Sequence, residues 1–234
     1  MQAIILAGGF GTRLRSVLND TPKPMAPIGD QPFLELLLLY LARQNFSEVT
    51  LSVGYLHEKI IDHFGEGYQN IALRYAIETT PLGTGGAIRH ALGVLKPVEP
   101  VFVLNGDTFS NIDYATMSQI HQQCQSPLTL ALTRVDNAGR YGKVSVAGGR
   151  ITEFQEKTQA GSGLINSGIY LISPNLFDER HLPESFSFEQ DFLYPHVAEL
   201  MPCAFENDGY FIDIGIPEDY QRAQRELPAL LASH

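Results

Sequence analysis

The stretch that decides the interpretation of this chain is Ala3-Ile4-Ile5-Leu6-Ala7-Gly8-Gly9-Phe10-Gly11-Thr12-Arg13-Leu14. Its first residues are apolar and β-branched, which predicts a buried β-strand. The glycines that follow let backbone N–H groups approach a ligand closely, and several parallel N–H groups form an anion site. The arginine beyond them adds a guanidinium fork suited to phosphate. We therefore predict a triphosphate-binding loop at the carboxyl end of the first strand.

Two common glycine signatures do not fit this loop. A Walker loop ends in Gly-Lys followed by Ser or Thr, and no such residues follow here. The dinucleotide fingerprint requires a glycine three residues after Gly11, where this sequence has Leu14. A tight turn at the exit of the strand, with no ligand, is the structural alternative for the glycines taken alone.

The segment Thr21-Pro22-Lys23-Pro24-Met25 favours the phosphate site over a simple turn. Its prolines fix their own φ angles and restrict the residues before them to extended backbone. Lys23 is therefore held on a stiff segment, which a merely solvated lysine does not need. We predict that Lys23 and the glycine loop serve one site.

Composition limits the classes of function. The chain has 234 residues with 16 Lys and Arg against 26 Asp and Glu, a formal charge of −10. A nucleic-acid-binding protein would show a basic face, so this charge balance argues against that class. A phosphate substrate remains compatible, because a few focused cations suffice, and a bound divalent cation would offset crowded negative charge.

Cysteine usage and hydropathy bear on location. Cys124 and Cys203 are far apart in the sequence and show neither metal-ligand spacing nor a disulfide framework, so we expect a reducing cytoplasm. The seven histidines are scattered, which argues against a zinc cluster. No basic and apolar leader opens the chain, and no run approaches the ~18 apolar residues needed to span a bilayer. We expect a cytoplasmic protein without a membrane partner.

Strand and helix patterns alternate through the first part of the chain. This order predicts an α/β fold with a doubly wound, mainly parallel, Rossmann-like sheet, in which ligands bind outside the carboxyl ends of the strands. The second part has strand patterns with little helix between them, which predicts a smaller antiparallel lobe. We expect one domain, with a nucleotide-binding half over about 1–135 and a sugar-phosphate lobe over about 136–234. The expected strands are 49–53, 73–77, 101–104, 128–135, 144–146, 151–154 and 165–172, and the expected helices are 33–42, 57–64, 83–95, 114–124 and 217–227.

Two aspartates are candidate metal ligands. Asp107 follows a buried strand and Asp213 ends an apolar strand before a glycine. Carboxylates at such exits suit a hard cation, and the two side chains could converge on one Mg²⁺ with substrate phosphates and waters. An Asx-turn or a helix N-cap is the structural alternative for Asp107.

Three further segments carry polar or glycine signals. The glycines of 81–87 suit close approach to a flat base or a phosphate, with an ordinary helix entry capped by Thr84 as the alternative. Glu156 and Lys157 at a strand end are typical of a solvated rim. Asn166 lies inside an apolar strand, where it either pairs with backbone or binds a hydroxyl-rich ligand.

Taken together, these motifs resemble the signature of the sugar nucleotidyltransferases, enzymes that join a sugar 1-phosphate to a nucleotide. Within that family the sequence is most similar to the D-glycero-α-D-manno-heptose 1-phosphate guanylyltransferases, on 14–17, 22–27 and 211–220. The motifs that carry the resemblance are Gly8-Gly9-Phe10-Gly11-Thr12-Arg13-Leu14, Thr21-Pro22-Lys23-Pro24, Leu82-Gly83-Thr84-Gly85-Gly86, Asn105-Gly106-Asp107, Tyr141-Gly142-Lys143-Val144, Phe154-Gln155-Glu156-Lys157, Ile165-Asn166-Ser167-Gly168-Ile169-Tyr170 and Asp213-Ile214-Gly215.

The resemblance implies roles for individual residues. It implies catalytic roles for Arg13 on the β- and γ-phosphates, Lys23 on the α-phosphate, and Lys157. It implies Mg²⁺ as cofactor, held by Asp107 and Asp213. The implied nucleotide site is Leu6, Ala7, Gly8, Gly9, Gly11, Thr12, Arg13, Lys23, Gly83, Thr84 and Gly85, and the implied sugar-phosphate site is Asn105, Gly142, Glu156, Lys157 and Asn166.

The expected reaction is transfer of a nucleoside monophosphate from GTP to a heptose 1-phosphate, with release of pyrophosphate, for surface polysaccharide synthesis. Mannose 1-phosphate with GTP, or a hexose 1-phosphate with UTP, stays open as the substrate pair. A metal-dependent glycosyltransferase is the competing class, but it would usually show Asp-x-Asp where this sequence has Asn105-Gly106-Asp107. A nucleotide-sugar sensor is a third class, and it need not keep Lys23, Asp107, Lys157 and Asp213 together. The oligomeric state has no signal in the sequence, which leaves a homo-oligomer open.

Overall fold

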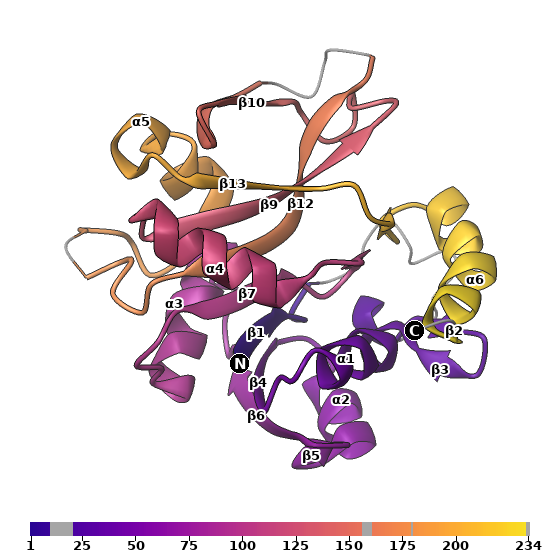
Figure 1. Ribbon diagram of the computed structural model, residues 1–234. Helices are drawn as coiled ribbons and strands as arrows, with labels where there is room; N and C mark the ends of the chain where they lie inside the picture. Colours follow the sequence, from indigo (N-terminus) through magenta and orange to yellow (C-terminus); the bar gives the residue numbers. More distant parts are fainter. Residues whose placement is uncertain (10–20, 156–160, 179, 233–234) are drawn as a thin grey trace.

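The computed structural model describes residues 1–9, 21–155, 161–178 and 180–232. A ten-stranded sheet in the order β10-β11-β13-β9-β12-β7-β1-β4-β6-β5 runs through them (Figure 1). Its strands are β1 (Gln2–Leu6), β4 (Glu48–Val53), β5 (Gly67–Tyr68), β6 (Ile71–Ile77), β7 (Val101–Asn105), β9 (Leu128–Val135), β10 (Val144–Ala147), β11 (Arg150–Phe154), β12 (Gly163–Ile172) and β13 (Cys203–Asn207).

Two short pairs of strands and several helices complete the fold. The pairs are β2 (Pro27–Ile28) with β3 (Gln31–Pro32), and β8 (Thr108–Ser110) with β14 (Phe211–Asp213). The helices are α1 (Phe33–Arg43), α2 (His57–Phe64), α3 (Gly83–Leu95), α4 (Tyr114–Cys124), α5 (Val197–Leu200) and α6 (Pro217–Ala232), with a 3₁₀ turn at Lys23–Met25 and a π-helical segment at Phe188–Leu193.

The expected doubly wound α/β sheet is confirmed. β7, β1, β4 and β6 are parallel neighbours, and the antiparallel strand β12 joins β7 to β9. Of the strands after residue 135, β10, β11, β12 and β13 extend this same sheet instead of lying over it (Figure 1), whereas β14 pairs with β8 in a separate two-stranded sheet. They continue it because β12 pairs with β9 over Gly163–Asn166 and Tyr170–Ile172 on one side, and with β7 over Ile169–Ile172 on the other.

The core consists of two apolar layers, one on each face of the sheet. Alternate residues of β1 point to opposite faces, so Ala3 and Ile5 belong to one layer and Ile4 to the other. The first layer also contains α1, α2, α4 and α6 residues, and the second contains α3 and the segment 186–193. Both faces of a parallel sheet must be covered, which explains the nearly continuous apolar runs of its strands.

Gly106 allows the carboxyl ends of β1 and β7 to lie close together at one edge of the sheet. The N–H of Gly106 donates to the carbonyl of Leu6 at 2.9 Å, and a Cβ at Gly106 would lie 2.6 Å from that oxygen. A larger residue would therefore push the two strand exits apart. Asp107 directly follows this contact, so the same glycine places an acid beside the end of β1.

A disulfide corrects one expectation from the sequence. Cys124 and Cys203, 79 positions apart, are disulfide-bonded, with their Cα atoms 6.3 Å apart. The pair forms because α4 packs on β13 and β9, so that the last residue of α4 meets the first residue of β13. Because the two cysteines are far apart in the sequence, no local pattern indicated this contact. Since they are disulfide-bonded, they no longer support the expectation of a reducing compartment. No helix of the described residues is both long and apolar enough to cross a membrane.

Candidate functional site

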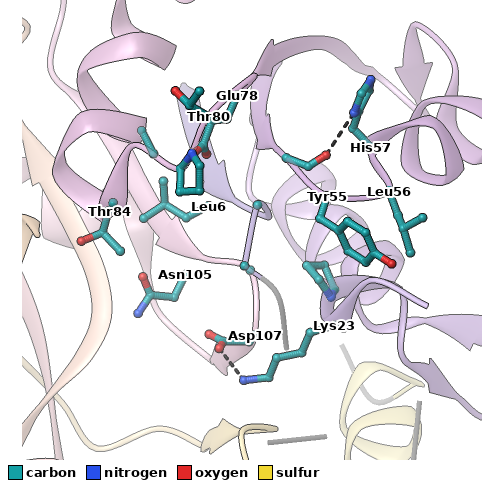
Figure 2. A pocket seen from close by; sticks show the side chains of 18 of the residues that line it. Leu6, Lys23, Tyr55, Leu56, His57, Glu78, Thr80, Thr84, Asn105 and Asp107 are labelled. Carbon is teal, nitrogen blue, oxygen red and sulfur yellow. Dashed lines mark hydrogen bonds and ion pairs between the residues drawn. The ribbon is translucent and has the colours of Figure 1, made fainter. Parts of the chain in front are cut away.

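A cavity of about 630 Å³ opens beside the carboxyl ends of β1, β4, β6 and β7 (Figure 2). Predicted site residues that line it are Leu6, Gly8, Gly9, Lys23, Gly83, Thr84, Asn105 and Asp107. Further lining comes from Gly54 to Glu58, between β4 and α2, and from Glu78 to Pro81, between β6 and α3. The location is the one expected for a ligand of a doubly wound sheet.

Glu78 forms a fixed anionic wall of this cavity. Its Oε1 accepts a hydrogen bond from Ser52 Oγ at 3.0 Å, and its Oε2 accepts one from the backbone N–H of Leu82 at 3.3 Å. Gly8 allows the close approach, because a Cβ there would lie 2.8 Å from Glu78 Oε1. The carboxylate is thereby held in one orientation, with acceptor capacity left for a ligand.

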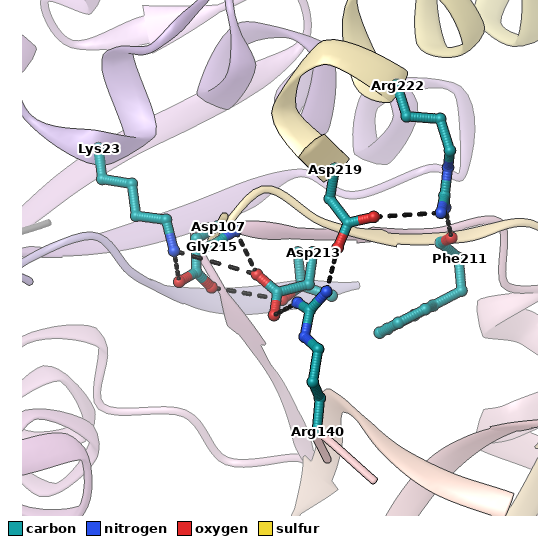
Figure 3. A network of polar contacts seen from close by, with 9 residues as sticks. Lys23, Asp107, Arg140, Phe211, Asp213, Gly215, Asp219 and Arg222 are labelled. Carbon is teal, nitrogen blue, oxygen red and sulfur yellow. Dashed lines mark hydrogen bonds and ion pairs between the residues drawn. The ribbon is translucent and has the colours of Figure 1, made fainter. Parts of the chain in front are cut away.

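Asp107 and Asp213 lie side by side, bridged by Lys23 (Figure 3). Lys23 Nζ donates to Asp107 Oδ2 at 2.5 Å and lies 4.0 Å from Asp213 Oδ1. The pairing of β14 with β8 brings the acids together, because Asp213 stands opposite Thr108, the residue after Asp107. The N–H of Ile214 also donates to the carbonyl of Asp107 at 3.0 Å.

The surroundings of Asp213 make its charge costly. Burial and the nearby charge of Asp107 raise the pKa of the Asp213 carboxyl, and Lys23, the N–H of Gly215 and Arg140 oppose that rise. The Gly215 N–H donates to Asp213 Oδ1 at 2.7 Å. Two adjacent carboxylates, one of them largely buried, require positive charge, which the Lys23 ammonium provides in this structure.

A chain of ion pairs continues from Asp213 to the C-terminal helix (Figure 3). Arg140 Nη2 lies 3.7 Å from Asp213 Oδ2, and its Nη1 lies 2.5 Å from Asp219 Oδ2. Arg222 Nη1 contacts the other oxygen of Asp219 at 3.2 Å. The loop between β9 and β10 is thereby joined to β14 and to the first turn of α6.

The glycines at the start of α3 serve the packing of another segment. A Cβ at Gly85 would lie 2.1 Å from the ring of Phe186, and one at Gly83, whose φ is +66°, would lie 2.6 Å from the Phe186 carbonyl. The N–H of Gly85 donates to that carbonyl at 2.9 Å. Thr84 does not cap the helix; its hydroxyl accepts the N–H of Phe188 at 2.8 Å.

Asn166 is held by a polar cluster on β12. Its Nδ2 donates to Tyr170 Oη and to Glu189 Oε1, both at 2.8 Å, and its Oδ1 accepts the N–H of Gly168 at 3.0 Å. Burial and the charge of Glu189 raise the pKa of the Tyr170 hydroxyl, so that it remains a donor to Glu189. Only an acceptor position on Asn166 Oδ1 is left for a ligand. Asn105 lies against Gly168, where a Cβ would be 2.4 Å from its Nδ2.

Known proteins similar to this chain agree with the resemblance seen in its sequence motifs. Residues 2–229 match the family model described as nucleotidyl transferase. This chain belongs to the nucleotidyl transferase family. Two relatives named D-glycero-alpha-D-manno-heptose 1-phosphate guanylyltransferase are each 46% identical to it. The one from Aneurinibacillus thermoaerophilus aligns over 97% of this chain and 98% of its own, and the one from Campylobacter jejuni over 94% and 97%.

A solved structure shares both fold and sequence with this nucleotidyl transferase. HddC from Yersinia pseudotuberculosis superposes with a TM-score of 0.85 at 39% identity, covering 96% of this chain and 98% of its own. A second HddC structure, described as complexed with GMP-PN, gives a TM-score of 0.83 at 38% identity. The family assignment and the α/β fold therefore agree with the sequence resemblance.

The family generally uses a divalent metal ion, and the carboxylate pair fits one. The carboxylates of Asp107 and Asp213 already flank a cation, the Lys23 ammonium. On a bound metal ion, two carboxylates would leave coordination positions for phosphates and water. Within the described residues no cluster of three or more His, Cys, Asp or Glu side chains is arranged for a metal. Any ion bound by this pair would thus depend on substrate oxygens and water for the rest of its shell.

Some predicted site residues of this nucleotidyl transferase have other contacts or lie outside the described residues. Ala7 is buried, and its N–H donates to the Ser52 carbonyl at 2.8 Å. The N–H of Gly142 is bonded to the Ala138 carbonyl at 3.0 Å. Gly11, Thr12, Arg13, Glu156 and Lys157 lie outside the described residues, so their roles remain predictions.

Sequence reasoning did not find Glu78, Arg140, Asp219 or Glu189. Glu78 directly follows β6, and a strand end in a parallel sheet was a signal that could have identified it. Arg140 precedes the quoted Tyr141-Gly142 motif without any pattern of its own. Asp219 and Glu189 act through contacts with residues far away in the chain, which no local pattern reveals.

Proposed function

We propose that this nucleotidyl transferase transfers GMP from GTP to a sugar 1-phosphate and releases pyrophosphate. D-glycero-α-D-manno-heptose 1-phosphate is the proposed acceptor, and the GDP-sugar would supply surface polysaccharide synthesis. The observation that carries the proposal is the Asp107–Asp213 pair bridged by Lys23 at the edge of the cavity. The near full-length relatives named for this activity support the substrate pair.

The chemistry of Glu78 supports guanine as the base. Guanine presents two adjacent donors, N1–H and the 2-amino group, whereas uracil and thymine present a single N–H between two carbonyls. A carboxylate accepts two parallel N–H bonds, and Glu78 keeps one accepting position on each oxygen after Ser52 and Leu82 have been satisfied. We therefore assign Glu78 to the Watson–Crick edge of guanine.

The reaction brings together two polyanions that repel one another. We propose that this chain overcomes the repulsion mainly by supplying positive charge and by positioning the substrates. The sugar phosphate oxygen would attack the α-phosphorus in line with the departing pyrophosphate, and it is already an anion, so no general base is required. Mg²⁺ held by Asp107 and Asp213 would supply charge neutralisation of the phosphates when bound. Lys23 stands at the cavity on a proline-flanked turn, from which its ammonium would contact the α-phosphate. Arg13 and Lys157 are proposed to neutralise the remaining phosphates.

The acceptor is proposed to bind on the side of β12. Asn166, with its amide fixed by Glu189 and Tyr170, offers Oδ1 to a sugar hydroxyl. Asn105 lines the cavity and lies against Gly168, two residues after Asn166. Gly142, Glu156 and Lys157 complete the proposed sugar-phosphate site.

The organisation proposed for the chain follows from this division. Residues of about 1–135 would bind the nucleotide and residues of about 136–234 the sugar phosphate, within one domain. We also propose a cytoplasmic location.

A substrate matrix tests the proposal. The wild-type protein is incubated with Mg²⁺ and each of four nucleoside triphosphates against heptose, mannose and glucose 1-phosphates, and pyrophosphate release is measured. We expect the highest kcat/KM for GTP with heptose 1-phosphate. Preference for mannose 1-phosphate or for UTP would correct the substrate pair, and no pyrophosphate from any pair would refute the activity.

One variant tests the metal site within that assay. Asp107→Ala should lower kcat by roughly 10²–10³, the scale of removing one preorganised charge-stabilising group. Asp62→Ala is the matched control, because Asp62 is exposed on α2 and does not line the cavity. Wild-type turnover in Asp107→Ala would show that this carboxylate has no part in catalysis.

A further inference from the structure

Arg140 reaches the carboxylate pair from the side opposite Lys23 (Figure 3). Its guanidinium lies 3.7 Å from Asp213 Oδ2, whereas Lys23 lies nearest Asp107 and approaches Asp213 through Oδ1. Arg140 also packs on the ring of Tyr141, with its Cζ 5.0 Å from the ring centroid, and that ring meets Phe211 of β14. The guanidinium is therefore anchored beside β14 by packing as well as by charge.

The charges of this arrangement cancel before any ligand arrives. Asp107 and Asp213 carry two negative charges, and the cations paired with them, Lys23 and Arg140, carry two positive charges. The side chains of Asp107 and Asp213 are 36% and 24% exposed, so solvent screens these charges incompletely. A divalent cation that approaches the pair from solution is attracted by the acids and repelled by both cations, and the two effects are of similar size.

Asp219 moderates the repulsion from Arg140. It holds Nη1 of Arg140 at 2.5 Å, more closely than Asp213 holds Nη2, and its own side chain is only 14% exposed. Asp219 therefore adds a negative charge on the far side of the guanidinium. Removing Arg140 or Asp219 consequently changes the charge around Asp213 in opposite directions.

We propose, on the basis of the function proposed above, that Arg140 weakens the binding of a free divalent cation to the Asp107–Asp213 pair and that Asp219 limits this effect. The free enzyme then binds metal weakly, and the phosphates of the nucleotide supply the additional negative charge that retains the ion. Arg140 acts through Asp213 and needs no contact with substrate.

The two residues predict opposite changes in metal affinity. Arg140→Met should tighten binding of Mn²⁺ by about tenfold, because one charge a few ångströms away in partly screened surroundings has an effect of that order. Asp219→Asn should weaken it about threefold or more, because the guanidinium then faces Asp213 without a counter-charge. A purely structural role would weaken binding in both variants, since each disrupts the same contacts.

Arg222 provides the matched control. It contacts Asp219 Oδ1 at 3.2 Å, and its other donors bond to the Phe211 carbonyl and to Glu226, so it is one residue further from Asp213 than Arg140 is. Arg222→Met removes the same charge from the same network. We expect it to change Mn²⁺ affinity by less than about threefold, because the interaction weakens with distance and screening.

The test is a titration of the full-length protein with Mn²⁺ in the absence of nucleotide, with free Mn²⁺ measured by electron paramagnetic resonance. Thermal unfolding verifies that each variant is folded, and Arg140→Gln serves as a second neutral variant. Tighter binding in the Arg140 variants with weaker binding in Asp219→Asn supports the proposal. Unchanged or weaker binding in both folded Arg140 variants, or equal tightening in Arg222→Met, overturns it.

A second arm separates this inference from the proposed activity. Adding a non-hydrolysable GTP analogue should tighten Mn²⁺ binding in the wild type and in Arg140→Met, because its phosphates add negative charge beside the same ion. Absence of any tightening in the wild type would refute the argument that the nucleotide phosphates retain the ion. Absence of pyrophosphate release by the wild type, with the Mn²⁺ pattern intact, would refute the reaction and leave the role of Arg140 standing.

Discussion

Replacing Glu78 by glutamine should weaken the selection of guanine. The carboxylate is held by Ser52 Oγ on Oε1 and by the Leu82 N–H on Oε2. A backbone N–H requires an acceptor, so the amide oxygen of Glu78→Gln must face Leu82, and the new amino group must face Ser52, whose hydroxyl can accept. One of the two positions offered to guanine then becomes a donor opposite a donor.

The magnitude follows from the single bond lost. A hydrogen bond to a charged group contributes about 1.5–3 kcal/mol, and an unsatisfied donor opposite the base adds to the loss. We therefore expect kcat/KM for GTP to fall roughly 10- to 100-fold, with thermal stability nearly unchanged, because both anchoring contacts can persist.

Comparing GTP with inosine triphosphate isolates the contact. Hypoxanthine lacks the 2-amino group of guanine, so the wild-type enzyme should prefer GTP by roughly tenfold or more, and Glu78→Gln should lose most of that preference. Glu58→Gln is the control, because Glu58 also lines the cavity but its side chain is 69% exposed and contacts His57. A Glu78→Gln enzyme that kept the wild-type preference, measured by pyrophosphate release, would refute the assignment.

The remaining predictions concern stability. Burial and Asp107 raise the pKa of Asp213, so the folded state binds this proton more tightly than the unfolded state does, and stability should fall as the pH rises from the ordinary aspartate pKa through the raised value. Asp213→Asn should therefore raise the free energy of unfolding in urea at neutral pH while activity is lost; equal or lower stability would contradict this. Gly85→Ala should destabilise the protein by more than 1 kcal/mol, because the added Cβ would lie 2.1 Å from the Phe186 ring, whereas Gly93→Ala in the same helix has open space and should stabilise it by about 0.5–1 kcal/mol. Cys203→Ser should lower stability by about 2–5 kcal/mol relative to the oxidised protein, because the lost cross-link joins residues 79 positions apart, and an unchanged urea midpoint would show that the thiols are not paired in solution.

Local sequence patterns were sufficient to predict most strands of the sheet and several of the helices that cover it. The helices expected at 57–64, 83–95 and 114–124 have the bounds of α2, α3 and α4, and the expected strand 128–135 is β9. Period and apolar runs are properties of neighbouring residues, so they can be identified without knowledge of the fold. β13 was not predicted, because Cys203–Asn207 is short and mixes buried with exposed positions, and its place beside β9 depends on pairing across more than 70 residues.

The sequence by itself predicted the location and class of the candidate site from an apolar strand that ends in glycines, a lysine fixed between prolines, and two acids at strand ends. These features depend on backbone stiffness and on apolar periodicity, which adjacent residues set. The tertiary structure alone decided the partners: Asp213 beside Asp107 through the β14–β8 pair, Arg140 between Asp213 and Asp219, Glu78 against Gly8, and Cys124 bonded to Cys203. Charge interactions and close packing act over a few ångströms between residues that the chain separates widely, so they exist only after the sheet has assembled.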